Sequence, residues 1–350
     1  MRLNLDGIEG RSCPTDAATT SSTGAWVPCA KSVATFRRTA RGTRYCQAGL
    51  TLPRRGRRAR SRSKSAKRVG NRARTPDAGV SSPQRRNRTR PPRGTGYTYP
   101  TVLTRTYIHI PGIDEQIERE LWLQGAEDWY ALVENPRRWR ISEPYLSAVL
   151  QGAATSIDAL EEGDHAYFAG KLPLREHWRA YEEFRFNTAY LDIETDGGTQ
   201  ITVVGVYDGE EVYQFVLGDN LDEFPDFIRE FSMLVTFNGL NFDVPMLSRN
   251  FPKLMLDQLH LDLCPTLRRL GLRGGLKRIE QQLGLLRDPD LDGLSGREAV
   301  QLWQAYRLGH DTALETLLRY NREDIVNLKP LAGLAYKRLR EKTTSLRPIR

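Results

Sequence analysis

The sequence predicts a mixed α/β fold, in which a three-strand antiparallel meander and parallel strands form one sheet with flanking helices. Three extended stretches separated by short turns occupy 187–217, as in a meander. Two shorter apolar stretches, at 233–237 and 256–262, alternate with helical patterns, which favours a mixed sheet with helices on its faces. From Pro265 onward the spacing of apolar residues is helical. A small helical segment and a basic arm precede this domain.

The first 100 residues differ in composition from the rest of the chain. They contain 23 Lys and Arg against 4 Asp and Glu, whereas the remaining 250 residues contain 29 and 39. Residues 53–93 have almost no large apolar side chains, and such a stretch cannot offset its ordering entropy. We therefore expect residues 1–100 to be a disordered basic arm, or an extension that is not part of the true protein. A nucleic-acid-binding arm is the alternative, because the arginines at 54–58 would bind phosphates by counterion release.

The cysteines and the apolar runs of the sequence indicate in which cellular compartment the protein works. Cys13, Cys29, Cys46 and Cys264 show no CxxC spacing, which argues against a zinc site and against a disulfide framework. No apolar run is long enough to span a membrane, and the N-terminus lacks the apolar core of a secretory signal. We predict a cytoplasmic protein with no membrane partner, and the oligomeric state stays open.

Residues 101–184 are predicted to form a small helical segment. A short extended run at 106–110 precedes a helix over 114–124, and further helices are expected at 143–152 and 172–184. The run 110–113 resembles half of a helix-hairpin-helix, but an aspartate stands where a second glycine is expected. Packing against the following domain is the favoured interpretation.

Residues 185–340 are predicted to form the main domain, whose elements alternate in the order that the mixed sheet requires. The predicted strands are 187–193, 200–207, 211–217, 233–237 and 256–262. The predicted helices are 221–231, 242–250, 275–284, 296–307 and 310–340, the last with a break near Asn321.

Two carboxylates, Asp192 and Glu194, end the first predicted strand of this domain. Residues i and i+2 of a strand point to the same face, so the two side chains project together, about 7 Å apart along the chain. Such a pair raises each other's pKa unless a cation lies between them, and Mg²⁺ and Mn²⁺ take oxygen ligands of this kind. Taken alone, the pair would more often be a solvated strand face.

A third carboxylate follows the apolar strand at 233–237. The loop at 238–241 leads to Asp243, which opens a predicted helix, where N-terminal amides would hold a carboxylate. Asn238 is expected to hold the loop through side-chain hydrogen bonds to the backbone. An ordinary helix cap is the alternative interpretation of Asp243.

The last feature lies on the predicted helix at 310–340. Tyr320 and Asp324 are four residues apart and share a helix face, so the hydroxyl and the carboxylate point toward one place. Arg322 and Glu323 face elsewhere. Taken alone, an exposed acidic residue beside a packed tyrosine would be the simpler interpretation.

The three motifs, in this order, resemble the DEDD 3′→5′ exonuclease superfamily, and the tyrosine marks its DEDDy branch. Asp243 follows Asp192 by 51 residues, and Asp324 follows Asp243 by 81. The helical pattern at 276–284 stands where such proteins carry a leucine-patterned helix. The amino acids within these motifs resemble those of the YprB-like ribonuclease H-like domain, and the resemblance covers about residues 187–338.

This resemblance implies a ribonuclease H-like sheet and a site for two Mg²⁺ or Mn²⁺ ions. Asp192 would bridge both ions, Glu194 and Asp324 would complete the ion that activates the attacking water, and Asp243 would act on the second. Two ions about 3.5–4 Å apart stabilise both the entering and the leaving oxygen of a phosphodiester displacement. Tyr320 would orient or deprotonate that water. Orientation is the favoured role unless the metals lower the pKa of Tyr320, because the ordinary pKa of tyrosine, near 10, makes it a poor base.

The activity that the resemblance implies is metal-dependent 3′→5′ hydrolysis of phosphodiester bonds, with the 3′ end of single-stranded DNA or RNA as the partner. Thr195, Asn238 and Asn241 lie at these motifs and are the candidate substrate-binding residues. Two alternatives stay open: a non-catalytic nucleic-acid-binding module on the same fold, and a two-metal endonuclease.

Overall fold

The computed structural model describes residues 101–344 of the chain. The predictions for residues 1–100, which include a disordered arm and three of the four cysteines, lie outside the described residues. The fourth, Cys264, is a free cysteine. None of the described helices is long and apolar enough to cross a membrane.

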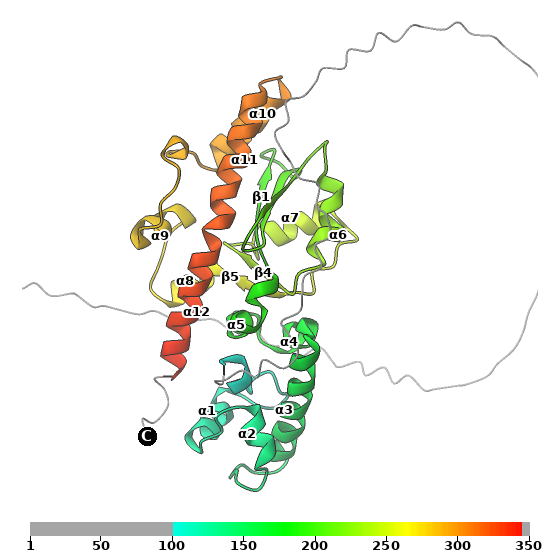
Figure 1. Cartoon of the computed structure of the whole chain (residues 1–350), viewed down its shortest axis with the longest axis vertical. Helices are drawn as coiled ribbons and strands as arrows, with labels where there is room; N and C mark the ends of the chain where they lie inside the picture. The colour runs from blue at the N-terminus through cyan, green and yellow to red at the C-terminus, as the bar shows by residue number, and fades with distance from the viewer. Residues whose placement is uncertain (1–100, 345–350) are drawn as a thin grey trace, which may run out of the picture. The chain divides into compact units, whose positions relative to one another are not determined.

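A five-stranded mixed sheet lies at the centre of the main domain (Figure 1). Its order is β3-β2-β1-β4-β5; the first three strands pair antiparallel, and β1, β4 and β5 pair parallel. The predicted meander and the predicted parallel strands are therefore both confirmed. The strands are β1 (Thr188–Thr195), β2 (Ile201–Tyr207), β3 (Val212–Val216), β4 (Met233–Thr236) and β5 (Leu259–Asp262).

Helices flank this sheet, as predicted. Those that follow β3 are η4 (Leu221–Glu223), α6 (Phe224–Ile228), α7 (Asp243–Asn250), α8 (Leu263–Arg269), α9 (Leu276–Leu283), η5 (Pro289–Leu291), α10 (Gly296–Arg307), α11 (Asp311–Val326) and α12 (Leu328–Thr344). The break that was expected near Asn321 falls instead at Asn327, between α11 and α12. Asn321 stays helical because its side-chain oxygen accepts a hydrogen bond from Gln214 (3.1 Å) and does not compete with the helix backbone.

Strand β1 presents alternate residues to the two faces of the sheet. Ile193 is buried in a cluster with residues of α6 and α7. Tyr190 is buried in a different cluster, with residues of α12. Asp192 and Glu194 follow Tyr190 in the alternation and therefore belong to its face, on which α11 also packs.

Helices precede the sheet, as expected for residues 101–184. They are η1 (Leu103–Arg105), α1 (Glu115–Leu123), α2 (Trp129–Glu134), α3 (Tyr145–Glu162), α4 (His165–Lys171), η2 (Leu174–Ala180), α5 (Tyr181–Phe184) and η3 (Arg185–Asn187). The extended run expected at 106–110 was wrong, because turns occupy it. Trp122 and Trp129 donate their indole N–H groups to the carbonyls of Arg105 and Thr106 (2.8 and 2.7 Å), so side chains rather than a neighbouring strand satisfy these two carbonyls.

The N-terminal helices and the sheet share one apolar core. Buried residues of α1 to α5 belong to the same cluster as those of β4, β5 and α12. Trp178 and Tyr181 pack on Tyr336 of α12, with ring centroids 6.2 and 5.9 Å apart. Tyr181 also hydrogen-bonds the hydroxyl of Tyr190 in β1 (2.8 Å). The helical segment therefore supports the strand that carries Asp192.

Candidate active site

Asp192 and Glu194 lie near the end of the central strand, which is paired on both sides. Asp192 is opposite Gly205 of β2, and Tyr190 is opposite a residue of β4. The register with β2 shifts between Glu194 and Thr195. Irregularities of this kind redirect side chains and are frequent beside active sites. Glu194 is buried, whereas Asp192 is half-buried.

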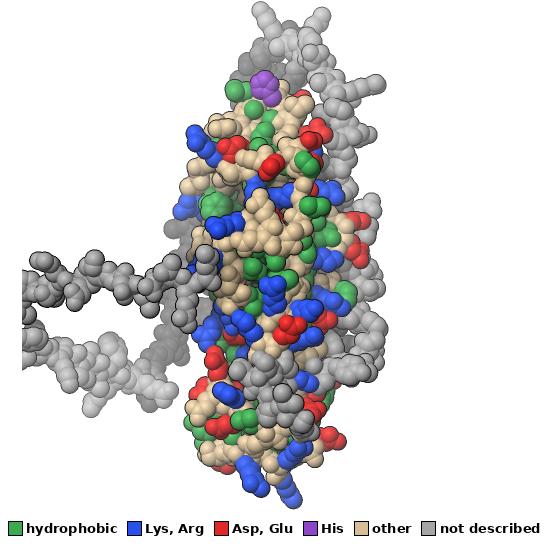
Figure 2. Space-filling model, turned by 90° about the vertical axis from the view of Figure 1, so that its left-hand side faces the viewer, with side chains coloured by type: hydrophobic (Ala, Val, Ile, Leu, Met, Phe, Trp, Pro, Cys, Tyr) green, Lys and Arg blue, Asp and Glu red, His purple; other side chains and the backbone are tan. Residues whose placement is uncertain are grey.

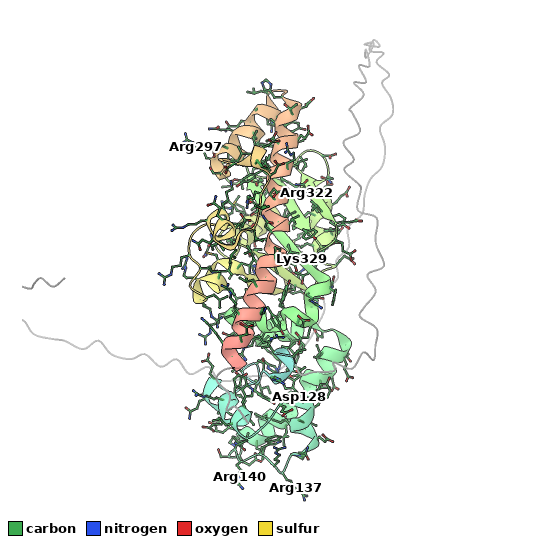
Figure 3. The ribbon with its side chains drawn as sticks, turned by 60° about the vertical axis from the view of Figure 1, so that its left-hand side comes forward. Asp128, Arg137, Arg140, Arg297, Arg322 and Lys329 are labelled. Atoms are coloured by element: carbon green, nitrogen blue, oxygen red, sulfur yellow. The ribbon has the colours of Figure 1, made fainter. Side chains whose placement is uncertain are left out.

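Tyr320 and Asp324 lie one turn apart on α11, and both are buried. The helix packs against β1 and β2, which brings this face toward the carboxylates of β1. Arg322 is exposed on the outer side of the helix (Figure 3). The helical spacing therefore separates the side chains that enter the site from those that face solvent.

Three carboxylates converge at this point. One oxygen from each of Asp192, Glu194 and Asp324 lies within 4.8 Å of the other two. Glu194 Oε1 and Asp243 Oδ1 are buried and have no hydrogen-bond partner within residues 101–344. Such oxygens cost free energy, and a hard divalent cation would supply the missing interaction. The donor set therefore fits a metal such as Mg²⁺ or Mn²⁺.

Asp243 is the first residue of α7 and is almost fully buried. It is not among the three residues whose oxygens lie within 4.8 Å of one another. Its charge nevertheless acts on the cluster, because it is the largest charge contribution that raises the pKa of Asp192. Burial raises the pKa of Asp243 itself to about 7, although the backbone N–H groups of Asp243 and Ile193 favour the charged form.

Burial and mutual repulsion make the ionised cluster costly without a cation. Burial, and then the charge of Asp243, raises the pKa of Asp192 well above its ordinary range. Burial and the charge of Asp324 do the same to the pKa of Glu194. Burial also raises the pKa of Asp324, but the neighbouring Arg287 guanidinium opposes that change. A cation between these groups would restore their charged forms.

The Tyr320 hydroxyl lies in a buried and negatively charged environment. Burial, and then the charges of Asp324 and Glu194, raises the pKa of Tyr320 well above its ordinary value. The phenol of the metal-free chain therefore keeps its proton near neutral pH, and the orienting role of Tyr320 stays a prediction.

The loop between β4 and α7 is anchored by Asp262, which the sequence did not single out. Asp262 accepts hydrogen bonds from the backbone N–H groups of Asn238 (2.7 Å), Leu240 (3.2 Å) and Cys264 (3.0 Å). Asn238 has φ 66°, and Asn241 donates to its side-chain oxygen (2.9 Å). Asp262 thus fixes the path of the chain from β4 to Asp243, and its place at the end of a strand is the signal that could have revealed it.

Asn321 is a second residue that the sequence did not assign to the site. It is fully buried, and its amide lies 3.4 Å from both the carbonyl and the carboxylate of Asp192. A Cβ on Gly205 would lie 1.9 Å from Asn321 Oδ1, so only glycine fits opposite Asp192. A glycine inside an otherwise branched strand is the sequence signal for such a close approach.

Two basic residues, Lys277 and Arg287, also reach the cluster. Arg287 Nη2 lies 2.5 Å from Asp324 Oδ1, and Arg287 also pairs through Nε and Nη2 with the buried Glu280 (2.5 and 2.9 Å). Lys277 Nζ lies 4.7 Å from the centroid of the Tyr320 ring. Both come from the region of α9, which sequence spacing could not connect to the carboxylates.

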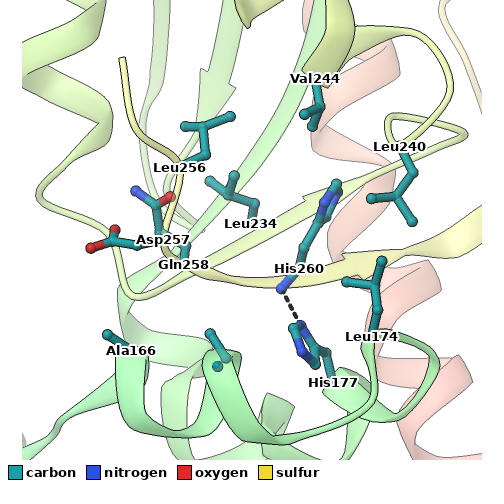
Figure 4. Close-up of a pocket in the computed structure, with 12 residues that line it drawn as sticks. Ala166, Leu174, His177, Leu234, Leu240, Val244, Leu256, Asp257, Gln258 and His260 are labelled. Atoms are coloured by element: carbon teal, nitrogen blue, oxygen red, sulfur yellow. Dashed lines mark hydrogen bonds between the residues drawn. The ribbon is translucent and has the colours of Figure 1, made fainter. Parts of the chain in front are cut away.

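A pocket of about 390 Å³ lies beside β5 and α4, and none of the clustered carboxylates lines it (Figure 4). His260 donates its backbone N–H to His177 Nδ1 (2.9 Å), and its ring bonds the hydroxyl of Thr236 (2.9 Å). Burial lowers the pKa of His260 to about 4. Because the walls are mainly apolar and these histidines are neutral and engaged, we assign the candidate active site to the carboxylate cluster.

Comparison with known proteins agrees with this fold. A family model of the RNase_H superfamily matches residues 189–336. The fold is RNase H-like. In the same comparisons, no curated protein and no solved structure matched the chain. The matched span of the RNase H-like domain includes all four carboxylates and Tyr320, and it supports a nuclease-type activity. The resemblance to the YprB-like, DEDDy branch stays a prediction.

Proposed function

We propose that the RNase H-like domain, residues 185–340, is a two-metal 3′→5′ exonuclease that hydrolyses phosphodiester bonds of nucleic acid in the cytoplasm. The convergence of Asp192, Glu194 and Asp324 carries this proposal. These residues are far apart in the sequence, and no structural need explains why a protein would gather acidic groups that repel one another. The 3′→5′ direction rests on the resemblance of the motifs to the DEDDy branch.

The residues divide into ligands and orienting groups. Asp192, Glu194 and Asp324 would hold the metal ions. Asp243 lies beside these three residues and would act on the second ion. When bound, the ions supply Lewis-acid stabilisation of the entering and leaving oxygens. Tyr320 keeps its proton and can donate a hydrogen bond that orients the attacking water.

The candidate substrate-binding residues lie at the ends of the strands that carry the cluster. Thr195 ends β1, and its hydroxyl lies 3.4 Å from the backbone N–H of Gly197. Asn238 and Asn241 lie in the loop that Asp262 anchors. These positions suit contacts with the terminal nucleotide, because strand ends and their loops present side chains toward a ligand.

A basic surface near α9 supports a nucleic-acid partner. Between 263 and 286 the chain has five basic residues and one acidic residue, although residues 101–350 are acidic overall. Lys342 of α12 donates to the carbonyl of Arg269 in α8 (3.2 Å), so the basic end of α12 adjoins this surface. Figure 2, which faces the side where α8 and α9 lie in Figure 1, shows several Lys and Arg side chains there. Clustered Lys and Arg bind phosphates by counterion release.

The test is a nuclease assay on the full chain. We expect single-stranded DNA or RNA labelled at the 5′ end to shorten stepwise from its 3′ end in Mn²⁺ or Mg²⁺. EDTA should stop the reaction. Asp192→Asn should reduce the rate by at least about 100-fold, because it removes a metal ligand with almost no change in volume.

Three outcomes would contradict the proposal. Cleavage of a circular single strand would indicate an endonuclease, because an exonuclease needs an end. A mobility shift without cleavage would indicate a binding module. Equal activity of the wild type and Asp192→Asn would place the chemistry elsewhere.

A further inference from the structure

The ammonium group of Lys277 is buried, although the residue as a whole is only partly buried. Its Nζ has no hydrogen bond among the described residues, although it lies over the ring of Tyr320. An ammonium group has three donors, and a buried one without acceptors is costly and uncommon in native structures. Burial lowers the pKa of Lys277, while the charge of Asp324 opposes that change. The contact with an aromatic ring offsets only part of the cost.

Arg287 is held rigidly beside the same carboxylate. The buried Glu280 binds its Nε and Nη2, and Asp324 binds its Nη2. Its Nη1 has no hydrogen bond among the described residues. A guanidinium clamped by a buried acid keeps one orientation, and its free donors remain available to an anion.

The simpler interpretation is that both cations only balance the charge of the carboxylates. Arg287 fits that interpretation, because it touches Asp324. Lys277 does not, because a lysine that served only to neutralise a carboxylate would hydrogen-bond one. An unused ammonium beside Tyr320 and Asp324 instead matches the place where a negatively charged substrate would meet the cluster.

We propose that Lys277, with Arg287 beside it, forms a phosphate-binding site at the edge of the carboxylate cluster. Lys277 Nζ donates to non-bridging oxygens of the phosphate that enters the site, and Arg287 adds a fixed positive charge. The site takes a phosphomonoester or phosphodiester group attached to a nucleoside. This inference rests on the proposed function, because it assigns the substrate of that function its phosphate contact.

The test measures binding and needs no turnover. Adenosine 5′-monophosphate and adenosine are titrated calorimetrically into the full chain in Mn²⁺, so that the two ligands differ only in the phosphate. Wild type should bind the monophosphate more tightly than the nucleoside. Lys277→Met keeps an unbranched aliphatic side chain without the charge and should weaken monophosphate binding about tenfold or more, with adenosine binding unchanged. Lys277→Arg should retain most of the affinity.

Arg297→Met is the matched control, because it removes the same charge from an exposed position of α10, outside the basic surface. It should leave the affinity for the monophosphate within about twofold. Equal monophosphate affinity of the wild type and a folded Lys277→Met would overturn the inference. A chain that prefers the monophosphate to adenosine through Lys277, but cleaves no nucleic acid, would support the phosphate site and refute the exonuclease. The failure of one proposal is therefore distinguishable from the failure of the other.

Discussion

At the scale of one residue, the ionised carboxylate of Asp192 lowers the stability of the metal-free fold. Its raised pKa means that the folded chain holds a proton which the unfolded chain releases. The same holds for Asp243, whose pKa rises from 3.8 to about 7. The metal-free fold therefore loses stability as pH rises from about 4 to about 7, and a bound cation should reverse that loss.

We expect Asp192→Asn to stabilise the metal-free protein. In EDTA at pH 8, its Tm should exceed that of wild type by about 3 °C or more, because one buried negative charge is gone. Addition of Mn²⁺ should raise the Tm of wild type and have little effect on the variant. Thermal denaturation at pH 5, 6.5 and 8, with EDTA or Mn²⁺, measures both effects.

Asp219→Asn provides the comparison, because Asp219 is exposed and lies outside the cluster. It should neither raise the Tm in EDTA nor alter the response to Mn²⁺. A wild-type chain whose Tm does not respond to Mn²⁺ at pH 8 would show that the carboxylates do not hold that metal.

At the scale of elements, the contact between β2 and α11 depends on one missing side chain. Gly205 leaves the space that Asn321 occupies, and Asn321 in turn touches Asp192. The strand and the helix approach closely here because position 205 has no side chain, and that approach brings Asp324 toward β1.

We expect Gly205→Ala to destabilise the protein by about 2–3 kcal/mol, because the new methyl group would overlap the Asn321 amide. Chemical denaturation measures the effect. Asn321→Ala in the same chain should recover part of this loss, so the two substitutions should not be additive. Additive effects would show that the glycine is needed for another reason.

The elements themselves were largely predictable. Extended apolar stretches separated by turns predicted all five strands, and the i, i+4 spacing placed Tyr320 and Asp324 on one face of α11. The run 106–110 misled because local turns and distant side chains satisfy its backbone, and local patterns do not encode the distant partners. The helix break expected near Asn321 does not occur there, because the buried partners of the Asn321 side chain are compatible with the helix.

The candidate site was only partly predictable. Asp192 and Glu194 are close because the strand alternates, and that follows from the sequence. Lys277 and Arg287 meet the cluster through tertiary packing of the α9 region, and no periodicity relates them to β1. Asp262 acts through backbone N–H groups of a loop, so its role depends on where that loop passes.

At the scale of the whole molecule, buried neutral histidines link stability to acidity. Burial lowers the pKa of His109 to about 3 and that of His260 to about 4, against an ordinary value of 6.5. Between about pH 6.5 and pH 4, these histidines therefore bind protons in the unfolded chain but not in the folded chain. The stability that these residues contribute is complete above about pH 6.5 and is lost as pH falls toward 4.

We expect His109→Gln to make the free energy of unfolding depend less steeply on pH below about 6.5. Each buried histidine adds a slope of up to about 1.4 kcal/mol per pH unit below 6.5, and the variant lacks one of them. Urea denaturation between pH 7 and pH 4.5 measures the slope. His310→Gln is the control, because His310 is exposed, and it should keep the slope of wild type. An unchanged slope in His109→Gln would mean that His109 is accessible to protons in the folded state.

The core that joins the N-terminal helices to the sheet also constrains how this chain can be divided. A piece cut at residue 185 would keep every proposed ligand, yet it would uncover the apolar side of Tyr190 and Tyr336 that Tyr181 and Trp178 now shield. Such a fragment would tend to aggregate. The smallest portion that folds is therefore larger than the smallest portion that holds the chemistry, and recombination or truncation within this protein has to respect the former.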